Sequence, residues 1–306
     1  MSGRRVAILG EPTGWHASRL AASFASRGHA VDIVPWRQLS AGLAIAASRQ
    51  ETIGPAAIAE ADRIVVRGMP GGIAPTQWLH EVIFRMNLLG RIASRGCRVI
   101  NSPRSLEVAI DKHLSLCHIA AAGLPVPATR VVQDAATAVA AWDDLGGDCL
   151  LKPLFGSRGR GLMRLRSAAD VEAATRSATA VESCGGVFYI QQFIPHPGWD
   201  VRILLVGDKS FSMRRRAAPG EWRTNLACGG QAEPFTPPDE WLSMARQAAA
   251  AVGTEIAGVD LIPTPDGGVA VLEVNGVPGW RGLETATGAD ITAAVAEYVA
   301  QSTFAS

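Results

Sequence analysis

The sequence predicts an α/β protein in which a parallel sheet precedes a region of mainly antiparallel strands. Over the first hundred residues, apolar strand-like segments alternate with helix-like segments, which is typical of βαβ units. From Val187 onward, short apolar segments follow one another with few helices between them, which indicates antiparallel sheet. The chain has 306 residues, 48% of them hydrophobic and 19% charged. That length allows about two or three domains with apolar cores.

The N-terminal third is expected to contain four strands and two long helices. The strands are Arg4–Gly10, Ala30–Trp36, Asp62–Gly68 and Cys97–Asn101, and the helices are His16–Gly28 and Thr76–Arg95. Parallel sheets bind ligands at the carboxyl ends of their strands, which here carry the glycine-containing segments 10–14 and 68–72. Neither segment has the G-x-G-x-x-G spacing, so a nicotinamide-binding fingerprint is not supported.

After residue 102 the pattern of elements changes twice. The middle part predicts helices at about Asp111–Ala122, Ala135–Leu145 and Ala168–Ser183, and strands at Thr129–Val132, Cys149–Pro153 and Leu162–Leu165. The last part predicts strands at Val187–Ile194, Asp200–Gly207, Ser210–Arg216, Gly258–Pro263 and Val269–Asn275, and helices at Pro238–Val252 and Asp290–Ala300. We therefore expect three domains or subdomains, at residues 1–101, 102–185 and 186–306.

Two strands near the C-terminus carry the strongest candidate site. Asp260 lies within one apolar segment, and Glu273 and Asn275 lie within the next. The intervening residues 265–268 (PDGG) predict a hairpin turn. If the outer two of these residues flank a two-residue turn, Asp260 pairs with Glu273, and Asn275 falls on the same face. Two carboxylates and an amide form an oxygen-donor set suited to Mg²⁺ that carries substrate phosphates.

Structural explanations exist for each member of this set. Asp260 could cap a strand end, and Asn275 could only turn the chain before Gly276 and Pro278. However, acidic groups interrupt strands that are otherwise apolar, and a buried charge destabilises the fold unless it is compensated. The metal hypothesis is therefore favoured.

A glycine-rich loop over residues 156–161 (GSRGRG) is the second signal. Glycines let backbone N–H groups approach phosphate oxygens, and the mobile tip of a hairpin could close over a nucleotide as a lid. A plain hairpin tip is the alternative, because no Walker motif is present. Lys152 lies in the strand that enters the loop. Of the 29 basic residues 26 are arginines, so the three lysines, Lys112, Lys152 and Lys209, are candidates for sites that need a compact charge.

The bulk composition indicates a small-molecule ligand. The formal net charge of +1 gives no global reason to expect nucleic acid or an anionic membrane as the partner. The five cysteines form no C-x-x-C pair and indicate reduced thiols. No signal-peptide pattern and no apolar run near the length of a membrane span occur, so we expect a cytoplasmic protein; a homo-oligomer is left open.

Several motifs together resemble the ATP-grasp carboxylate–amine ligases, and among them the RimK-like α-L-glutamate ligases. The motifs occur in the family's order: Asp111-Lys112, Leu151-Lys152-Pro153 with the glycine-rich loop, Gln191–Ile194, Arg215-Arg216, Arg223–Leu226, Gly258–Asp260 and Glu273–Gly279. The resemblance covers residues 102–300, and the first hundred residues are similar to the Rossmann-like domain that precedes the ATP-grasp fold in these enzymes. It implies an ATP-grasp fold with the metal site in the C-terminal subdomain.

The resemblance also implies roles for individual residues. Lys112 and Lys152 match phosphate-binding lysines, and Gln192 with Phe193 matches the hinge strand against adenine. The remaining ATP-binding positions are Gly156, Ser157, Gly159, Gly161, Asp200 on the ribose side, and Arg202. Arg215, Arg223 and Asn225 match catalytic positions near the triphosphate and the acceptor. Asp260, Glu273 and Asn275 match ligands of Mg²⁺ or Mn²⁺, with two ions expected. Two positions depart from the family pattern: glutamate is common where Gln192 stands, and Trp280-Arg281 replaces a different pair.

The chemistry implied by the family is ATP-dependent amide formation. A carboxylate attacks the γ-phosphate to give an acylphosphate, and the amine of an amino acid, expected to be L-glutamate, then displaces phosphate. The expected acceptor is a small cofactor such as a pterin or furan C1 carrier, because no basic surface directed at the ribosome is evident. The alternatives are a protein C-terminus as acceptor, a D-alanine–D-alanine-type ligase, and a non-catalytic nucleotide-binding scaffold. Arg214–Arg216, together with Arg202 and Arg223, favour an anion-binding wall over a solvated strand end, and the histidines are interpreted as structural or solvated.

Overall fold

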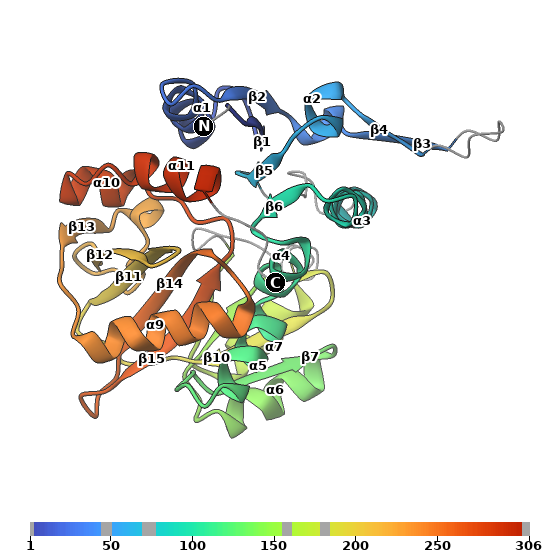
Figure 1. Cartoon of the computed structure of the whole chain (residues 1–306). Helices are drawn as coiled ribbons and strands as arrows, with labels where there is room; N and C mark the ends of the chain where they lie inside the picture. The colour runs from blue at the N-terminus through green and yellow to red at the C-terminus, as the bar shows by residue number, and fades with distance from the viewer. Residues whose placement is uncertain (1–2, 44–50, 69–77, 155–160, 178–183, 302–306) are drawn as a thin grey trace.

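The computed structural model describes residues 3–43, 51–68, 78–154, 161–177 and 184–301. Within these ranges three main sheets and one two-stranded ribbon form the α/β fold that the sequence predicts (Figure 1). The predicted lid residues Gly156, Ser157 and Gly159 lie outside the described residues. No helix of the described ranges is long and apolar enough to cross a membrane.

The N-terminal sheet is parallel and has the strand order β2-β1-β5-β6. Its strands are β1 (Arg5–Leu9), β2 (Ala30–Val34), β5 (Arg63–Val66) and β6 (Arg98–Ile100), and its long helices are α1 (Trp15–Ala25) and α3 (Trp78–Ser94). All of these elements match the predicted ones to within a few residues. The carboxyl ends of β1 and β5 therefore meet at one edge, which faces the C-terminal part of the chain.

A short excursion between β2 and β5 is not predicted from the sequence. It contains the 3₁₀ turn η1 (Trp36–Gln38), the antiparallel strands β3 (Ser40–Leu43) and β4 (Glu51–Gly54), and helix α2 (Ala56–Ala59). Figure 1 shows β3 and β4 as a ribbon that extends away from the body of the protein. Strands of four residues that bury little apolar surface have no clear hydrophobic period, which explains why they were missed.

The middle part has an antiparallel sheet of order β7-β10-β8-β9. Its strands are β7 (Thr129–Val132), β8 (Cys149–Lys152), β9 (Met163–Leu165) and β10 (Phe188–Gln192), and helices α6 (Ala135–Asp144) and α7 (Ala168–Arg176) pack against one another. The predicted helix at 111–122 is confirmed as α5 (Lys112–Ala121), but a separate helix, α4 (Pro103–Ile110), precedes it. The two helices are separate because Asp111 leaves the helical conformation and caps α5 by accepting hydrogen bonds from the backbone N–H groups of His113 and Leu114.

The C-terminal part has a five-stranded antiparallel sheet of order β13-β12-β11-β14-β15. The strands are β11 (Trp199–Val206), β12 (Lys209–Arg216), β13 (Gln231–Pro234), β14 (Ile256–Pro263) and β15 (Val269–Asn275). The other elements are the 3₁₀ turn η2 (Leu226–Cys228) and the helices α9 (Asp239–Val252), α10 (Arg281–Thr287) and α11 (Ile291–Gln301). Strand β13 and helix α10 are additions to the predicted set.

One side chain ties the N-terminal sheet to the C-terminal strands. Asn101, which follows β6, is 2% exposed, and its amide nitrogen donates to the carbonyl oxygens of Ile256 at 2.7 Å and Gly276 at 2.6 Å. Its amide oxygen accepts from the backbone N–H groups of Glu255 and Ile256. These four bonds fix the end of the parallel sheet against the start of β14 and the end of β15.

Candidate active site

A cleft between the middle sheet and the C-terminal sheet collects most of the predicted site residues. Its empty space, including the part open to solvent, is about 890 Å³. The predicted residues that line it are Lys112, Lys152, Gln192, Phe193, Asp200, Arg215, Arg223, Asn225, Asp260 and Glu273. Lys112 and Glu273 are 161 positions apart in the sequence, and the fold brings both to this cleft.

The hairpin of β14 and β15 pairs Asp260 with Glu273, as predicted. The predicted two-residue turn, however, is wrong. The N–H of Thr264 donates to the carbonyl oxygen of Gly268 at 3.0 Å, so three residues form the turn, and Gly267 adopts a positive φ of 85°. A three-residue turn alone would shift the register by one residue.

A bulge restores the predicted pairing. Leu261 pairs with Val271, whereas Asp260 pairs with Glu273, so Leu272 has no opposite residue. Neighbouring residues of a regular strand face opposite sides of a sheet, yet Leu272 and Glu273 both line the cleft. The sequence prediction therefore reached the right pair because the turn length and the bulge compensate for one another.

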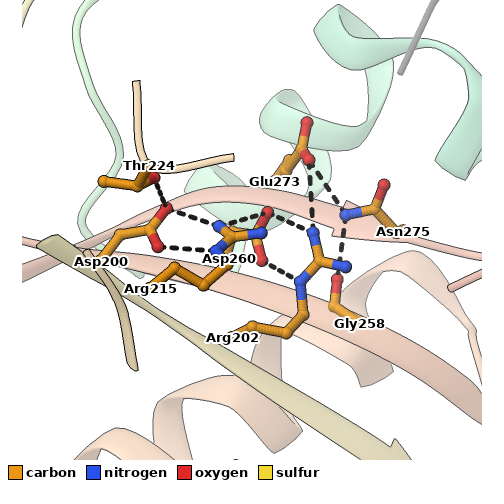
Figure 2. Close-up of polar contacts among 8 residues, drawn as sticks. All are labelled: Asp200, Arg202, Arg215, Thr224, Gly258, Asp260, Glu273 and Asn275. Carbon is orange, nitrogen blue, oxygen red and sulfur yellow. Dashed lines mark hydrogen bonds and ion pairs between the residues drawn. The ribbon is translucent and has the colours of Figure 1, made fainter. Parts of the chain in front are cut away.

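Two guanidinium groups hold the Asp260 carboxylate. Arg202 from β11 reaches both carboxylate oxygens, with Nη2 2.6 Å from Oδ2, and Arg215 Nη2 from β12 lies 3.1 Å from Oδ2 (Figure 2). Asp260 is 2% exposed. Burial opposes its ionisation, but the two arginines outweigh burial and lower the pKa of Asp260 to about 2. The carboxylate is therefore charged at any physiological pH.

Asp200 continues this network away from the hairpin. Its Oδ1 accepts from Arg215 Nε at 2.7 Å, and its Oδ2 accepts from Arg215 Nη2 at 2.5 Å and from the Thr224 hydroxyl at 2.7 Å. Burial disfavours the charged form of Arg215, but Asp200 and Asp260 raise its pKa above the ordinary value. Asp200 lines the cleft where the ribose contact is predicted, yet in this structure both of its oxygens hold protein side chains.

Glu273 and Asn275 lie at the outer end of the network in Figure 2, where Glu273 Oε1 is 4.0 Å from Arg202 Nη2. The Asn275 amide nitrogen donates to Glu273 Oε1 at 3.0 Å and to the carbonyl oxygen of Gly258 at 3.2 Å. Neither of these bonds uses the amide oxygen of Asn275. The Glu273 side chain is 38% exposed. These two residues offer oxygen atoms to a hard cation, whereas Asp260 would have to share its oxygens with Arg202 and Arg215.

The donor set fits a cation that arrives with its substrate. Within the described ranges no group of three His, Cys, Asp or Glu side chains could hold a metal ion by itself. Asp260 and Glu273 supply two carboxylates, and Asn275 adds an amide. Mg²⁺ is usually held by one or two carboxylates and completes its shell with water and phosphate oxygens, so these three residues fit Mg²⁺ bound to a nucleotide.

The two predicted lysines lie on the opposite wall of the cleft. Lys152 Nζ donates to Gln191 Oε1 at 2.6 Å, and Lys112 Nζ donates to the carbonyl oxygen of Leu154 at 3.2 Å. Burial lowers the pKa of Lys152 to about 8, partly opposed by Glu273, and burial also lowers the pKa of Lys112. These two bonds go to neutral oxygen atoms, and an anion in the cleft would stabilise the charged lysines.

The predicted hinge residues lie at the end of β10. The backbone N–H of Gln192 donates to Ala128 and that of Phe193 donates to Asp148, each at 2.9 Å. A base that enters here would therefore meet the carbonyl groups or side chains of Gln192 and Phe193, since their N–H groups are occupied within the protein.

Aromatic and charged groups around Phe193 were not predicted as site residues. The Arg164 guanidinium carbon lies 3.5 Å from the Phe193 ring centroid, and Asp148 holds that guanidinium in place. Trp222 meets the Phe193 ring edge to face. His196, interpreted from the sequence as structural or solvated, lines the cleft, and burial lowers its pKa.

Apolar side chains complete the cleft, and sequence analysis missed them as well. They are Leu150, Leu162, Ile194, Ile262 and Leu272. An aliphatic residue that faces a base has the same sequence pattern as one that faces the core, so no local signal distinguishes them. Gly161 is the one predicted loop glycine that the structure describes. It has a φ of 71°, and a Cβ atom there would lie 2.9 Å from Pro153 Cγ.

The predicted arginine wall is only partly correct. Arg214 and Arg216 pair with Glu233 of the neighbouring strand, and neither lines the cleft. Only Arg215 faces the cleft, because alternate residues of β12 point to opposite sides. Arg223 and Asn225 do line it, and Arg223 pairs with Glu221, with 2.5 Å between Nη2 and Oε2.

Comparisons with known proteins agree with this geometry. A model of the RimK-like ATP-grasp domain matches residues 109–299. The chain is 31% identical to tetrahydromethanopterin:alpha-L-glutamate ligase of Methanosarcina acetivorans, over 94% of this chain and 96% of that protein. It is 34% identical to a probable alpha-L-glutamate ligase of Mannheimia succiniciproducens, over 70% of this chain and 71% of that protein.

A solved structure shows the same fold. The ATP-grasp ligase PsnB, complexed with a minimal precursor, Mg and ADP, is similar to this chain with a TM-score of 0.68 and 21% identity. The similarity covers 98% of both chains. Because the family model covers more than half of the chain and the first relative nearly all of it, the chain belongs to the RimK-like ATP-grasp family of carboxylate–amine ligases.

Proposed function

We propose that this protein is an ATP- and Mg²⁺-dependent ligase that joins the amine of L-glutamate to the carboxylate of a small pterin-type cofactor. The observation that carries the proposal is the composition of the cleft. One wall offers the half-buried cations Lys112 and Lys152, and the other offers oxygen donors at Glu273 and Asp260. Cations opposite a magnesium-type donor set suit a nucleoside triphosphate and its metal ion.

Each part of the cleft has an expected task. Lys112, Lys152 and Arg215 would neutralise the phosphates, while Gln192 and Phe193 would lie against the base. Asp260, Glu273 and Asn275 would hold up to two Mg²⁺ or Mn²⁺ ions. When bound, the metal supplies charge that offsets the negative charge of the transferring phosphoryl group. Arg202 and Asp200 would keep Asp260 and Arg215 in position.

The reaction would proceed in two steps. An acceptor carboxylate oxygen attacks the γ-phosphorus of ATP, the bond to the bridging oxygen breaks, and ADP leaves. Cations around the phosphates stabilise this transfer, and Arg223 and Asn225 lie near enough to orient the acceptor end. The glutamate nitrogen then attacks the acyl carbon, phosphate leaves with the bonding electron pair, and the nitrogen loses its proton to form the amide.

The relatives support glutamate and a pterin as the two substrates. The relative that is similar over 94% of this chain is named for tetrahydromethanopterin and glutamate. The chain's near-neutral composition gives no sign of a basic surface for a ribosomal acceptor.

Two of the cysteines are poor candidates for a covalent acyl intermediate. Burial raises the pKa of Cys149 and Cys97 to about 11, so neither thiol is ionised near neutral pH and a thiolate route is not favoured there.

The test is a ligation assay with the purified full-length chain. ATP, Mg²⁺, isotopically labelled L-glutamate and a carboxylate-bearing tetrahydropterin are expected to give ADP, phosphate and a pterin heavier by one glutamyl residue. The same assay with a ribosomal-protein C-terminal peptide tests the protein-acceptor alternative. Product on the peptide alone would contradict the pterin assignment, and no ATP turnover with any acid and amine would indicate a scaffold.

A further inference from the structure

Arg67 does not line the cleft and lies directly after β5, at the carboxyl edge of the parallel sheet. Its backbone N–H donates to the Leu9 carbonyl oxygen at 2.7 Å, so its position continues the sheet. The side chain reaches across to the C-terminal part. Its guanidinium carbon lies 4.2 Å from the Trp280 ring centroid, and Nη2 donates to the Pro278 carbonyl oxygen at 2.9 Å. Ligands of parallel sheets bind at this edge.

The charge of Arg67 has no acidic partner in the part of the chain that the structure describes. Burial alone lowers its pKa to about 9, with no carboxylate raising it. Its Nε is buried and donates to none of the described atoms. A guanidinium carries five N–H donors, and a buried arginine is normally paired with an acid. Because Nε is enclosed by the protein, an anionic ligand that compensates this charge would meet the terminal Nη groups.

The Trp280 ring that supports Arg67 is itself fixed. Trp280 is fully buried, its Nε1 donates to the Thr292 hydroxyl at 3.0 Å, and its backbone N–H donates to His16 Nε2 at 3.0 Å. The Thr292 hydroxyl in turn donates to Glu284 at 2.7 Å. The guanidinium therefore stacks on a surface that holds its plane in one orientation, as bidentate carboxylate recognition requires.

This arginine lies next to the metal-facing end of the cleft. Pro278, which accepts its hydrogen bond, follows the end of β15 by three residues, and its Cβ packs against Gly258, the residue paired with Asn275. On the same side, Leu226 from the segment that bears Asn225 packs against Gly282 of α10. The Arg67 guanidinium is therefore linked through Pro278 to the strand pair that carries Asp260 and Asn275.

We propose that Arg67 binds a carboxylate of the amino-acid substrate that takes no part in bond formation. The proposal rests on the proposed function. Only the amine of the incoming amino acid reacts, so every such substrate keeps at least one free carboxylate, whereas the reacting carboxylate of the acceptor must reach the phosphate. Arg67 would thus position the amino acid and select acids over amides.

The experiment compares Arg67→Met with Arg63→Met. Arg63 is the matched control because it lies at the other end of β5, is 7% exposed and donates to the Asp62 carbonyl oxygen. Initial rates are measured with L-glutamate, with its α-amide and with glutamine. We expect Arg67→Met to raise KM for glutamate by about tenfold or more, because that is the effect of losing one charge-assisted hydrogen bond. KM for ATP should stay within about twofold, and the preference for glutamate over one of its two amides should disappear.

Arg67→Lys is the second variant, in case the methionine variant is unstable. It keeps a cation but loses the planar fork, and we expect a smaller rise in KM for glutamate with kcat unchanged. Unchanged KM for glutamate in the variant that folds, a rise in KM for the acceptor instead, or the same effect in Arg63→Met would overturn the assignment. If wild-type protein forms no glutamyl product, the proposed function fails. If it does and Arg67 variants are unaffected, only the carboxylate assignment fails.

Discussion

The two walls of the cleft handle charge in opposite ways. On the wall formed by β11, β12, β14 and β15, every buried carboxylate meets a guanidinium of the same sheet: Asp260 meets Arg202 and Arg215, and Asp200 meets Arg215. On the wall formed by β8 and α5, the half-buried Lys152 and Lys112 donate to a side-chain amide and a backbone carbonyl. The carboxylates of the first wall are compensated by direct ion pairs, whereas the charge of Lys152 is offset through space by Glu273 and Asp260.

This difference shows where the free energy of ligand binding would come from. A compensated network keeps its charges and geometry whether or not a ligand is present, so it serves as a rigid frame for the metal. A buried lysine with neutral partners is destabilised, and an anion relieves that destabilisation when it binds. We therefore expect substitutions of Asp200 and Asp260 to lower the stability of the free protein. Substitutions of Lys112 and Lys152 should instead lower the affinity for the ligand.

Glu273→Gln should have the largest effect on activity. Glu273 is the partly exposed carboxylate of the compensated wall, and replacing it with an amide removes charge from the metal without removing a buried ion pair. We expect kcat to fall by about a hundredfold to a thousandfold, comparable to the loss of one strong transition-state contact, with an unchanged melting temperature. Glu233→Gln on β13 is the control, because Glu233 pairs with Arg214 and Arg216 away from the cleft. Normal Mg²⁺-dependent turnover in Glu273→Gln would refute the metal assignment.

Asp200→Asn should have the largest effect on stability. It removes the charge that compensates Arg215 inside the sheet, and breaking a buried ion pair costs about 3–5 kcal/mol in free energy of unfolding. The control is Asp148→Asn, which weakens the Asp148–Arg164 pair, since the Asp148 side chain is 41% exposed and such pairs contribute about 1 kcal/mol or less. Urea unfolding of both variants measures the difference. Equal losses would show that the buried Asp200–Arg215 pair stabilises the protein no more than the partly exposed Asp148–Arg164 pair.

Lys152→Arg should weaken ATP binding although it keeps the charge. The planar guanidinium must fit where a compact ammonium meets Gln191, and we expect about a tenfold loss of affinity, or about 1.4 kcal/mol. Lys209→Arg is the matched control, because Lys209 is 57% exposed and pairs with Glu297 at the surface. Calorimetric titration with ATP and Mg²⁺ checks both. Near-native affinity in Lys152→Arg would show that the site needs only positive charge.

The smallest expected signal is a proton taken up when ATP binds. In the free protein burial lowers the pKa of Lys152 to about 8, so at pH 8 the lysine is only partly charged. Nearby phosphates favour the ammonium and raise that pKa, so binding at pH 8 should take up about half a proton, and at pH 6 almost none. ATP affinity should accordingly fall as the pH rises above 8. Calorimetry in buffers of different ionisation enthalpy measures the uptake, which Lys152→Arg should abolish; uptake that persists in that variant would assign it to another group.

Much of the fold could be predicted because its strands and long helices are strongly periodic. The excursion with β3, β4 and α2, and the short elements α4, β13 and α10, could not. Their apolar residues are too few to set a period, and α4 is separated from α5 only by the capping of Asp111. The predicted boundaries at residues 101 and 185 stay predictions.

The candidate site divides along similar lines. Charged residues inside apolar strands, such as Asp260 and Glu273, are visible in the sequence because burying them needs a reason. The partners that supply that reason are not, since nothing in a single sequence states that Arg202 and Arg215 flank Asp260 from two neighbouring strands.

The bulge at Leu272 has a consequence for insertions and deletions in the hairpin. A hairpin one residue shorter that kept the three-residue turn but lacked the bulge would still set Asp260 opposite Glu273. The residue before Glu273 would then face the other side of the sheet, as regular alternation demands, and the cleft would lose an apolar contact. A one-residue deletion that removes the bulge would therefore leave Asp260 and Glu273 paired. It would remove an apolar contact between the cleft and its ligand.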